Sequence, residues 1–274
     1  MPASRPSVAA VSYLNTVPLI WGFEHSPLRE RIEMISCVPS ECARRVESGA
    51  ADLGLVPVAE MARLGLTAVP GLGIACRGAV RSILLLAPVA PGQIRRLAAD
   101  SGSRTSVALA RAILRRRWGV DPELIEMDPD PDEMLSSADA ALLIGDAALR
   151  VDPESAGVPV LDLGEEWLRL TGLPMVFAQW AGRPERTAPL LAAGRARWFE
   201  ESLEAGLASM DAIVERESAL RSFDPALVRR YLARHIVFRV GEEEERGMAA
   251  FRAFLAEDGV PDLTRAAAVV PEGA

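Results

Sequence analysis

The stretch VPSECARRVESGAADLGLVPVAE, residues 38–60, places a helix, a stop and a strand in close succession. Ser40 is the expected N-cap of the helix, and Gly49 is its expected C-terminal stop. The apolar run at 52–58 predicts a short buried strand, and Val58 begins another helical pattern. Short strands and helices that alternate this closely are typical of an α/β protein.

The same alternation extends in both directions along the chain. A helix is expected over 107–118, opened by the polar residues 101–106. Further buried strands are expected at 8–11, 82–86, 123–127, 140–144 and 175–180. After about residue 162 the pattern becomes mostly helical. We therefore expect two lobes with largely parallel sheets.

Composition excludes several classes of protein. The 274 residues carry a formal net charge of −8, with 50% hydrophobic and 25% charged residues, as in globular domains. The acidic balance argues against a nucleic-acid partner. No apolar stretch is long enough to span a membrane, and the N-terminus lacks a signal h-region, so we expect a cytoplasmic protein. The sequence leaves the oligomeric state open.

Motifs for cofactors and metals are missing. The chain contains no Lys, which excludes a Schiff-base lysine and a P-loop lysine. His25 and His235 lie far apart, and the three cysteines form no CxxC pair. Gly71 and Gly73 begin a GxG pattern that lacks the third glycine of a dinucleotide loop. We expect neither a metal site nor a cofactor.

Polar residues at several strand ends predict an anion-binding cleft. Thr105 and Ser106 lie at a helix start, where free backbone N–H groups favour a carboxylate, although plain N-capping is the alternative. Asn15, the only Asn in the chain, follows the first strand. Because open α/β sheets bind ligands beyond the carboxyl ends of their strands, we expect Asn15, Ser82, Thr105 and Gly145 to lie together.

The segment VSYLNTVPL, residues 11–19, resembles the N-terminal signature of the chorismate dehydratase family of the futalosine route to menaquinone. The resemblance continues collinearly, densely over about residues 7–182 and loosely over the helical tail. Its other segments are 38–60, the Arg81–Ser82 pair before SILLL, TSVALARAIL (105–114), ADAALLIGDAAL (138–149) and DLGEEWLRLTGLPMVFAQWAG (162–182).

The resemblance implies a fold. Members of this family are similar to type II periplasmic binding proteins, with two α/β lobes and a ligand cleft between them. On this basis we expect lobe one to comprise residues 1–87 and 179–274, and lobe two to comprise residues 88–178.

The resemblance also implies a reaction and its residues. Chorismate loses water and becomes 3-[(1-carboxyvinyl)oxy]benzoate, which makes the protein a lyase, with the substrate's own enolpyruvyl carboxylate as the expected base. Asn15 and Ser82 are the expected catalytic residues. The expected substrate-binding residues are Ser40, Arg81, Thr105, Ser106 and Gly145.

Two alternatives remain at this stage. One is a non-catalytic protein that binds a carboxylate or aromatic small molecule, because fold does not determine function. The other is the sister enzyme 1,4-dihydroxy-6-naphthoate synthase, which the resemblance links to a histidine in lobe two. Residues 88–178 contain no histidine, which counts against the second alternative.

Overall fold

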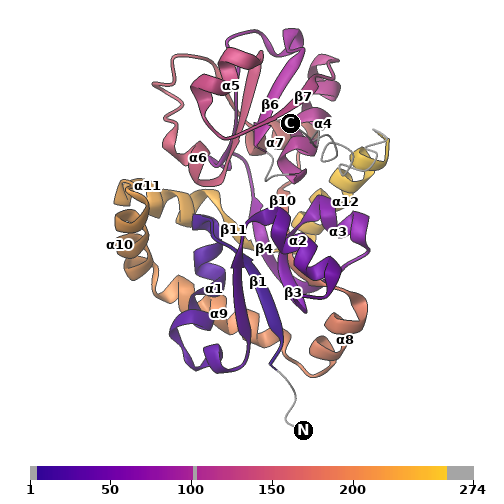
Figure 1. The fold of residues 1–274 in the computed structure, drawn as a ribbon, viewed down its shortest axis with the longest axis vertical. Helices are drawn as coiled ribbons and strands as arrows, with labels where there is room; N and C mark the ends of the chain where they lie inside the picture. Colours follow the sequence, from indigo (N-terminus) through magenta and orange to yellow (C-terminus); the bar gives the residue numbers. More distant parts are fainter. Residues whose placement is uncertain (1–4, 101–103, 258–274) are drawn as a thin grey trace, which may run out of the picture.

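The computed structural model describes residues 5–100 and 104–257, except the side chains of Pro39 and Ser40, and these residues form two α/β lobes (Figure 1). Each lobe is built on its own sheet, one of six strands and one of five. The two expected lobes are confirmed.

The six-stranded sheet has the order β11-β4-β10-β3-β1-β2. Its strands are β1 (Ser7–Val11), β2 (Glu33–Cys37), β3 (Leu53–Pro57), β4 (Thr67–Cys76), β10 (Met175–Gly182) and β11 (Val237–Arg239). Helices α2 (Pro39–Ser48) and α3 (Val58–Leu64) pack against it, and α1 (Val17–His25) packs against α9 (Ala196–Ala208).

The five-stranded sheet has the order β7-β6-β8-β5-β9. Its strands are β5 (Ile83–Leu86), β6 (Arg96–Asp100), β7 (Glu123–Met127), β8 (Ala140–Ile144) and β9 (Val160–Asp162). The helices of this lobe are α4 (Arg104–Trp118), α5 (Pro131–Ser137), α6 (Gly145–Arg150) and α7 (Leu163–Thr171).

The C-terminal part of the chain returns to the first lobe as a series of helices. These are α8 (Pro184–Ala192), α10 (Met210–Arg221), α11 (Pro225–Arg230), the π-helical turn η4 (Tyr231–His235) and α12 (Glu242–Glu257).

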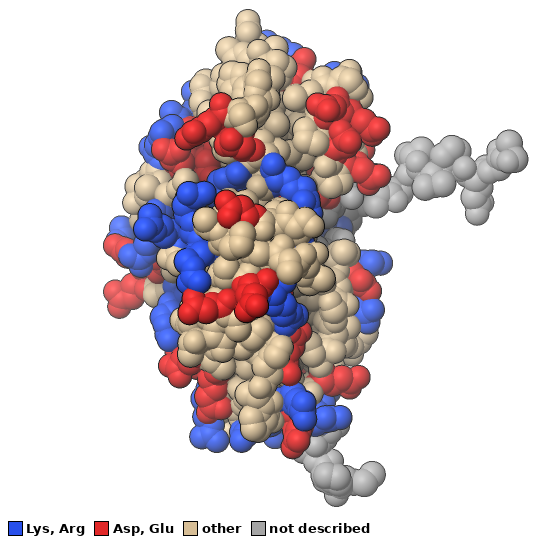
Figure 2. All heavy atoms as spheres, turned by 90° about the vertical axis from the view of Figure 1, so that its left-hand side faces the viewer, with Lys and Arg blue, Asp and Glu red and all other residues tan. Residues whose placement is uncertain are grey.

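Arg side chains and acidic side chains lie beside one another on the face of the molecule that Figure 2 shows.

Strand pairing moves the expected lobe boundaries. Strand β5, which the family resemblance had placed in lobe one, pairs with β8 and β9 in the five-stranded sheet, so the first crossing lies at 77–82 rather than at 87. Strand β10 pairs along its whole length with the six-stranded sheet, so the return crossing lies at 172–174, after α7, rather than at 178. A buried apolar strand has the same sequence pattern in either sheet, which explains the error.

The sheets are mixed rather than largely parallel. Strands β1, β2 and β3 are parallel, as are β6, β7 and β8, but β10 and β5 run antiparallel to their neighbours. The ten-residue strand β4 was not expected, because Pro70 and Gly71 suggest a loop. In the structure residues 69–72 form an irregularity opposite Trp180, and pairing resumes on both sides. No helix in the described ranges is long and apolar enough to cross a membrane.

Candidate functional site

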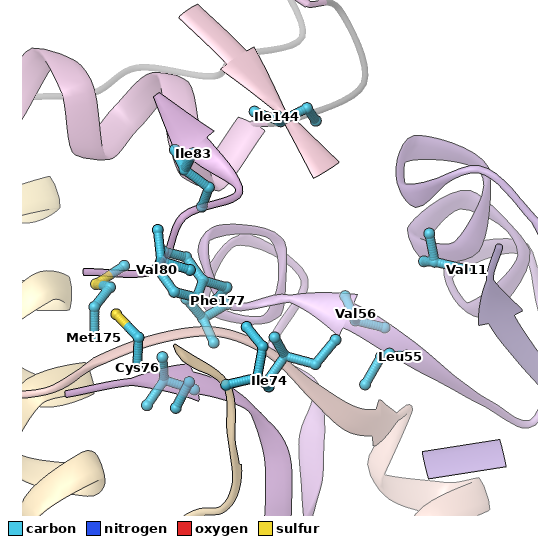
Figure 3. Packing of buried hydrophobic residues seen from close by; sticks show 14 of the residues in the cluster. Val11, Leu55, Val56, Ile74, Cys76, Val80, Ile83, Ile144, Met175 and Phe177 are labelled. Carbon is cyan, nitrogen blue, oxygen red and sulfur yellow. The ribbon is translucent and has the colours of Figure 1, made fainter. Parts of the chain in front are cut away.

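A pocket of about 620 Å³, including its open mouth, lies between the two lobes. Its apolar surface comes from both sheets: Figure 3 shows Ile83 and Ile144 on one side and Ile74 and Phe177 on the other. The polar residues on its lining are Tyr13, Asn15, Thr16, Ser82, Thr105 and Ser106.

Strand ends bring most of the expected residues into this pocket. Asn15 follows β1, Thr105 follows β6 and Gly145 follows β8, and all of them line it. Ser82 instead precedes β5, but the antiparallel pairing of Ile83 with Ile144 brings it to the same edge. There the Gly145 N–H donates to the Ser82 carbonyl at 2.8 Å.

Two expected residues have other places. The Arg81 guanidinium turns away from the pocket and donates to the carbonyls of Ala148, Leu149 and Val151 at the end of α6. The backbone of Arg81 has φ +68°, and Ser82 lines the pocket whereas Arg81 does not. Helix α2 has Val38 at its N-cap position rather than Ser40, because Pro39 occupies the first helical position. The side chain of Ser40 lies outside the described part of the structure.

Two buried oxygens on the lining lack hydrogen-bond partners among the described residues. They are Oδ1 of Asn15 and Oγ1 of Thr16, and the Thr16 residue is only 1% exposed. A buried polar atom without a partner costs about 1–3 kcal/mol, so such atoms are expected to meet a ligand or water. Asn15 caps no helix, since the N-cap positions of η1 (Leu14–Thr16) and α1 are Tyr13 and Thr16. Thr16 was missed, although it lies next to Asn15 in the signature.

The Ser82 hydroxyl has a partner that the sequence pattern did not reveal. The Tyr231 hydroxyl donates to Ser82 Oγ at 2.8 Å, and both residues are at most 2% exposed. Tyr231 lies 149 positions away in η4, within the helical tail where the family resemblance is loose. Only the three-dimensional structure brings it behind the pocket.

Tyr13 forms the contact between lobes at the edge of the pocket. A Cβ on Gly145 would lie 3.1 Å from the Tyr13 ring, and Gly145 has φ +56°, so this position favours glycine on two grounds. Burial raises the pKa of Tyr13 well above its usual value, and the charges of Asp100 and Asp146 raise it further. The phenol therefore stays neutral.

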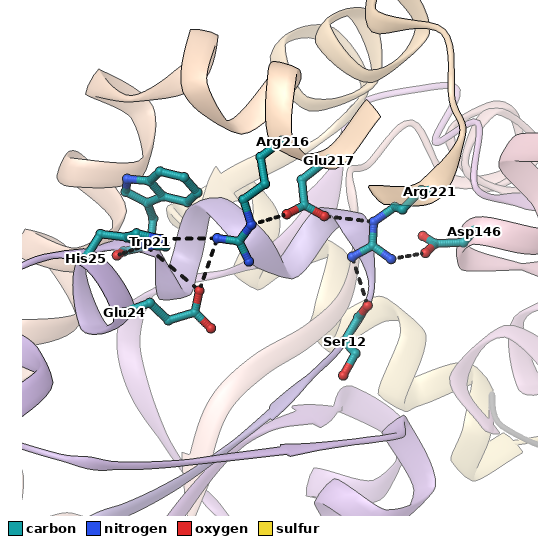
Figure 4. A network of polar contacts seen from close by, with 8 residues as sticks. All are labelled: Ser12, Trp21, Glu24, His25, Asp146, Arg216, Glu217 and Arg221. Atoms are coloured by element: carbon teal, nitrogen blue, oxygen red, sulfur yellow. Dashed lines mark hydrogen bonds and ion pairs between the residues drawn. The ribbon is translucent and has the colours of Figure 1, made fainter. Parts of the chain in front are cut away.

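Polar contacts also join the lobes around the pocket. Asp146, in the first turn of α6, accepts from the Leu14 N–H at 3.2 Å. It also accepts from Arg221 at 2.6 Å (Figure 4). Arg221 in turn donates to the Ser12 carbonyl and to Glu217. On another side of the pocket, the Ala59 N–H donates to Thr105 Oγ1 at 3.3 Å.

Charged groups are absent from the described lining of the pocket. That lining contains no Asp, Glu, Arg, His or Cys, and Tyr13 is its only titratable residue. His25 stacks on Trp21, and His235 contacts the Ala79 carbonyl in the crossing segment. Within the described ranges no cluster of His, Cys, Asp or Glu has the arrangement of a metal site. The pocket suits a small, largely apolar ring whose polar groups are held by uncharged side chains and backbone groups.

Sequence comparison gives two similarities. Residues 6–257 match a protein family described as menaquinone biosynthesis. The chain is 31% identical over 267 residues to the chorismate dehydratase of Thermus thermophilus, covering 90% of this chain and 94% of that protein.

Solved structures share the fold. A protein of Archaeoglobus fulgidus aligns with a TM-score of 0.73 at 15% identity, covering 95% of this chain and 100% of its own. The periplasmic aliphatic sulphonate binding protein of Escherichia coli aligns at 0.63 and 15% identity, covering 94% of each chain. A Candida albicans protein described as having the generic periplasmic binding protein fold aligns at 0.66 and 11%, covering 95% of this chain and 92% of its own. The expected periplasmic-binding-protein fold is confirmed.

Proposed function

Because the chain belongs to the menaquinone biosynthesis family, we propose that it is a chorismate dehydratase, which converts chorismate to 3-[(1-carboxyvinyl)oxy]benzoate. One observation supports this activity for this chain in particular. The pocket between the lobes gathers Asn15, Ser82, Thr105, Ser106 and Gly145, which come from separate parts of the sequence.

The chemistry demands placement more than a strong base. A ring C–H bond and the ring C–OH bond break, a proton and hydroxide leave as water, and the ring becomes aromatic. Aromatisation makes the step downhill, so holding the substrate in a reactive geometry supplies much of the acceleration. A pocket enclosed between two sheets is suited to this task.

The polar residues divide between two ends of the substrate. Thr105 and Ser106 lie in the first turn of α4, a helix of 15 residues, where backbone N–H groups and the helix dipole favour a carboxylate. Asn15 and Ser82 hold the reacting ring hydroxyl. The apolar side chains of Ile74, Ile83 and Phe177 contact the ring.

The proton acceptor is the substrate itself in this proposal. The described lining has no carboxylate, imidazole or thiol, and Tyr13 is held neutral by burial. The enolpyruvyl carboxylate of chorismate is a base that arrives with the substrate, close to the ring proton. The pocket then has only to fold that side chain back over the ring.

The test is turnover of chorismate by the purified protein. Loss of the cyclohexadiene absorbance, with a product lighter than chorismate by one water, supports the enzyme. A ligand-binding protein would shift the spectrum and leave the diene intact. That second result, at a protein concentration equal to the chorismate concentration, would overturn the proposal.

A further inference from the structure

Tyr231 belongs to no helix of regular geometry. It begins η4, a π-helical turn of five residues that follows α11, and such turns are frequent at functional sites. The residue is 1% exposed, does not line the pocket, and has its hydroxyl directed at Ser82 from behind. We propose that Tyr231 is a positioning residue, which sets the direction of the hydrogen bonds that Ser82 and Asn15 offer to the substrate.

The direction follows from counting protons. A tyrosine hydroxyl has one proton, and Tyr231 donates it to Ser82 Oγ at 2.8 Å. The Ser82 proton therefore cannot point back at Tyr231, and the pocket lies on its other side. Ser82 consequently presents an O–H donor to the ligand.

Asn15 offers the ligand a hydrogen-bond acceptor, whereas Ser82 offers a donor. Its Oδ1 is buried without a partner among the described residues, so it does not accept the Tyr231 proton. Burial raises the pKa of Tyr231, while its hydrogen bonds with the side chains of Ser82 and Asn15 oppose this rise. The Asn15 amide N–H thus faces the tyrosine oxygen, and its carbonyl oxygen remains as an acceptor for the ligand.

Tyr231 fixes these directions without taking part in proton transfer. If it gave up its proton, a tyrosinate would remain in a fully buried site, and desolvation disfavours that charge. Tyr231 therefore stays a donor throughout the working pH range. Its hydroxyl holds Ser82 in the donor orientation before the substrate arrives.

The inference rests on the proposed function for its chemical meaning. The ring hydroxyl of chorismate is both donor and acceptor, so it fits between the Asn15 carbonyl and the Ser82 hydroxyl. As the C–O bond breaks, negative charge grows on the departing oxygen, and an oriented Ser82 O–H stabilises it. Without Tyr231, Ser82 is free to rotate its proton away.

The experiment is a double-mutant cycle of Tyr231→Phe and Ser82→Ala, with chorismate turnover as the readout. We expect Tyr231→Phe to lower kcat about tenfold, with KM changed by less than about threefold, because the lost hydrogen bond acts on the developing charge. In the Ser82→Ala background the same change is expected to lower kcat by less than about threefold, because only the effect through Asn15 remains. An equal loss in both backgrounds, or no loss in the wild type, would overturn the inference.

A matched control separates positioning from general destabilisation. The Ser202 hydroxyl is also fully buried; it donates to the Leu19 carbonyl at 2.8 Å and accepts from the Phe23 N–H, between α9 and α1. Ser202→Ala is expected to lower the melting temperature while leaving kcat unchanged. A fall in kcat for this variant equal to that of Tyr231→Phe would show that both act through stability.

A second readout needs no turnover. Wild-type protein that consumes no chorismate refutes the proposed function, and the inference is then judged by proton NMR. We expect a tyrosine hydroxyl resonance protected from exchange, absent from Tyr231→Phe and lost or shifted in Ser82→Ala. A spectrum unaffected by Ser82→Ala would mean that Tyr231 does not donate to Ser82.

Discussion

Asn15 shows how much one side chain can reveal before and after the fold is known. Its rarity in the sequence and its place after the first strand predicted a role in the site. The structure adds the direction of its amide, with Oδ1 buried and unpartnered, among the described residues, on the pocket lining. The substitution of Asn15 by Asp is the sharpest test, because it preserves size while it replaces the N–H donor by a negative charge.

We expect Asn15→Asp to remain folded and to turn over chorismate at least about 10²-fold more slowly. The scale is that of losing one oriented polar contact, about 2.7 kcal/mol, and the new charge would face a dianion. The melting temperature and the turnover are measured on the same preparation. Near wild-type turnover would show that Asn15 does not contact the substrate.

The pH profile tests whether a residue of the protein acts as the base. Tyr13 is the only titratable residue on the described lining, and its raised pKa keeps it neutral up to strongly alkaline pH. The substrate carboxylate is already ionised at neutral pH. We therefore expect kcat/KM to be flat between about pH 6 and 9. An acid limb near pH 6–7 would instead indicate a histidine base and contradict the substrate-assisted mechanism.

At the residue scale, the sequence does not show in which direction a side chain points. Thr16 was overlooked because nothing in a sequence marks a hydroxyl that will be buried without a partner. Arg81 was assigned to the pocket because it precedes Ser82, yet its side chain donates to the backbone carbonyls at the end of α6. Tyr231 is remote in the chain, and its contact with Ser82 depends on how the C-terminal helices pack.

At the scale of elements, the start of α6 is constrained in two ways at Gly145. Gly145 has φ +56°, and its missing side chain leaves room for the Tyr13 ring. The left-handed conformation costs an L-residue about 1–2 kcal/mol. An added methyl group would also push the Tyr13 ring away from the place where it lines the pocket.

We expect Gly145→Ala to lower the melting temperature by about 2–8 °C and to raise KM for chorismate. Gly119, which follows α4, has φ +66° and no described atom within 4 Å of the place that an added methyl group would take, so Gly119→Ala is the matched control. The control is expected to lose similar stability without a change in KM. Equal KM values in the two variants would show that the Tyr13 contact is irrelevant to binding.

Buried strands were the easiest elements to predict, and strand direction was the hardest. Apolar runs such as 82–86 and 140–144 become β5 and β8 because both faces of these strands are covered. Their antiparallel pairing is absent from the sequence pattern, which is why Ser82 was expected at the carboxyl end of a strand and lies at an amino end. Strand β4 was missed because Pro70 and Gly71 interrupt its run of apolar residues.

At the scale of the whole molecule, two crossings join the lobes and a set of polar contacts holds them together. Asp162, at the end of β9, ties the first crossing to the second lobe, because its carboxylate accepts from the N–H groups of Val80 and Arg81. Between the lobes, Asp146 and Arg221 form an ion pair in which the two side chains are only 22% and 17% exposed. This pair exists only while the lobes are together.

We expect product to reduce the radius of gyration in small-angle scattering, and Arg221→Gln to need about tenfold more product for the same reduction. Loss of a charge-assisted hydrogen bond of about 1.5 kcal/mol shifts the open–closed balance by that factor. Arg229→Gln is the control, since its partner Asp211 is almost fully exposed. Identical titrations of Arg221→Gln and the control would show that the ion pair does not stabilise the closed form.

The uncharged lining of the pocket has a consequence for how the protein meets its substrate in salt solution. Long-range attraction between a dianion and cationic side chains is screened beyond about 10 Å at 0.1 M ionic strength, whereas dipoles in direct contact are scarcely screened. Capture of chorismate would therefore owe little to steering by charge and nearly everything to short-range fit. KM should change less than about threefold between 20 mM and 500 mM potassium chloride, so the same enzyme would work equally well in dilute and in concentrated electrolyte.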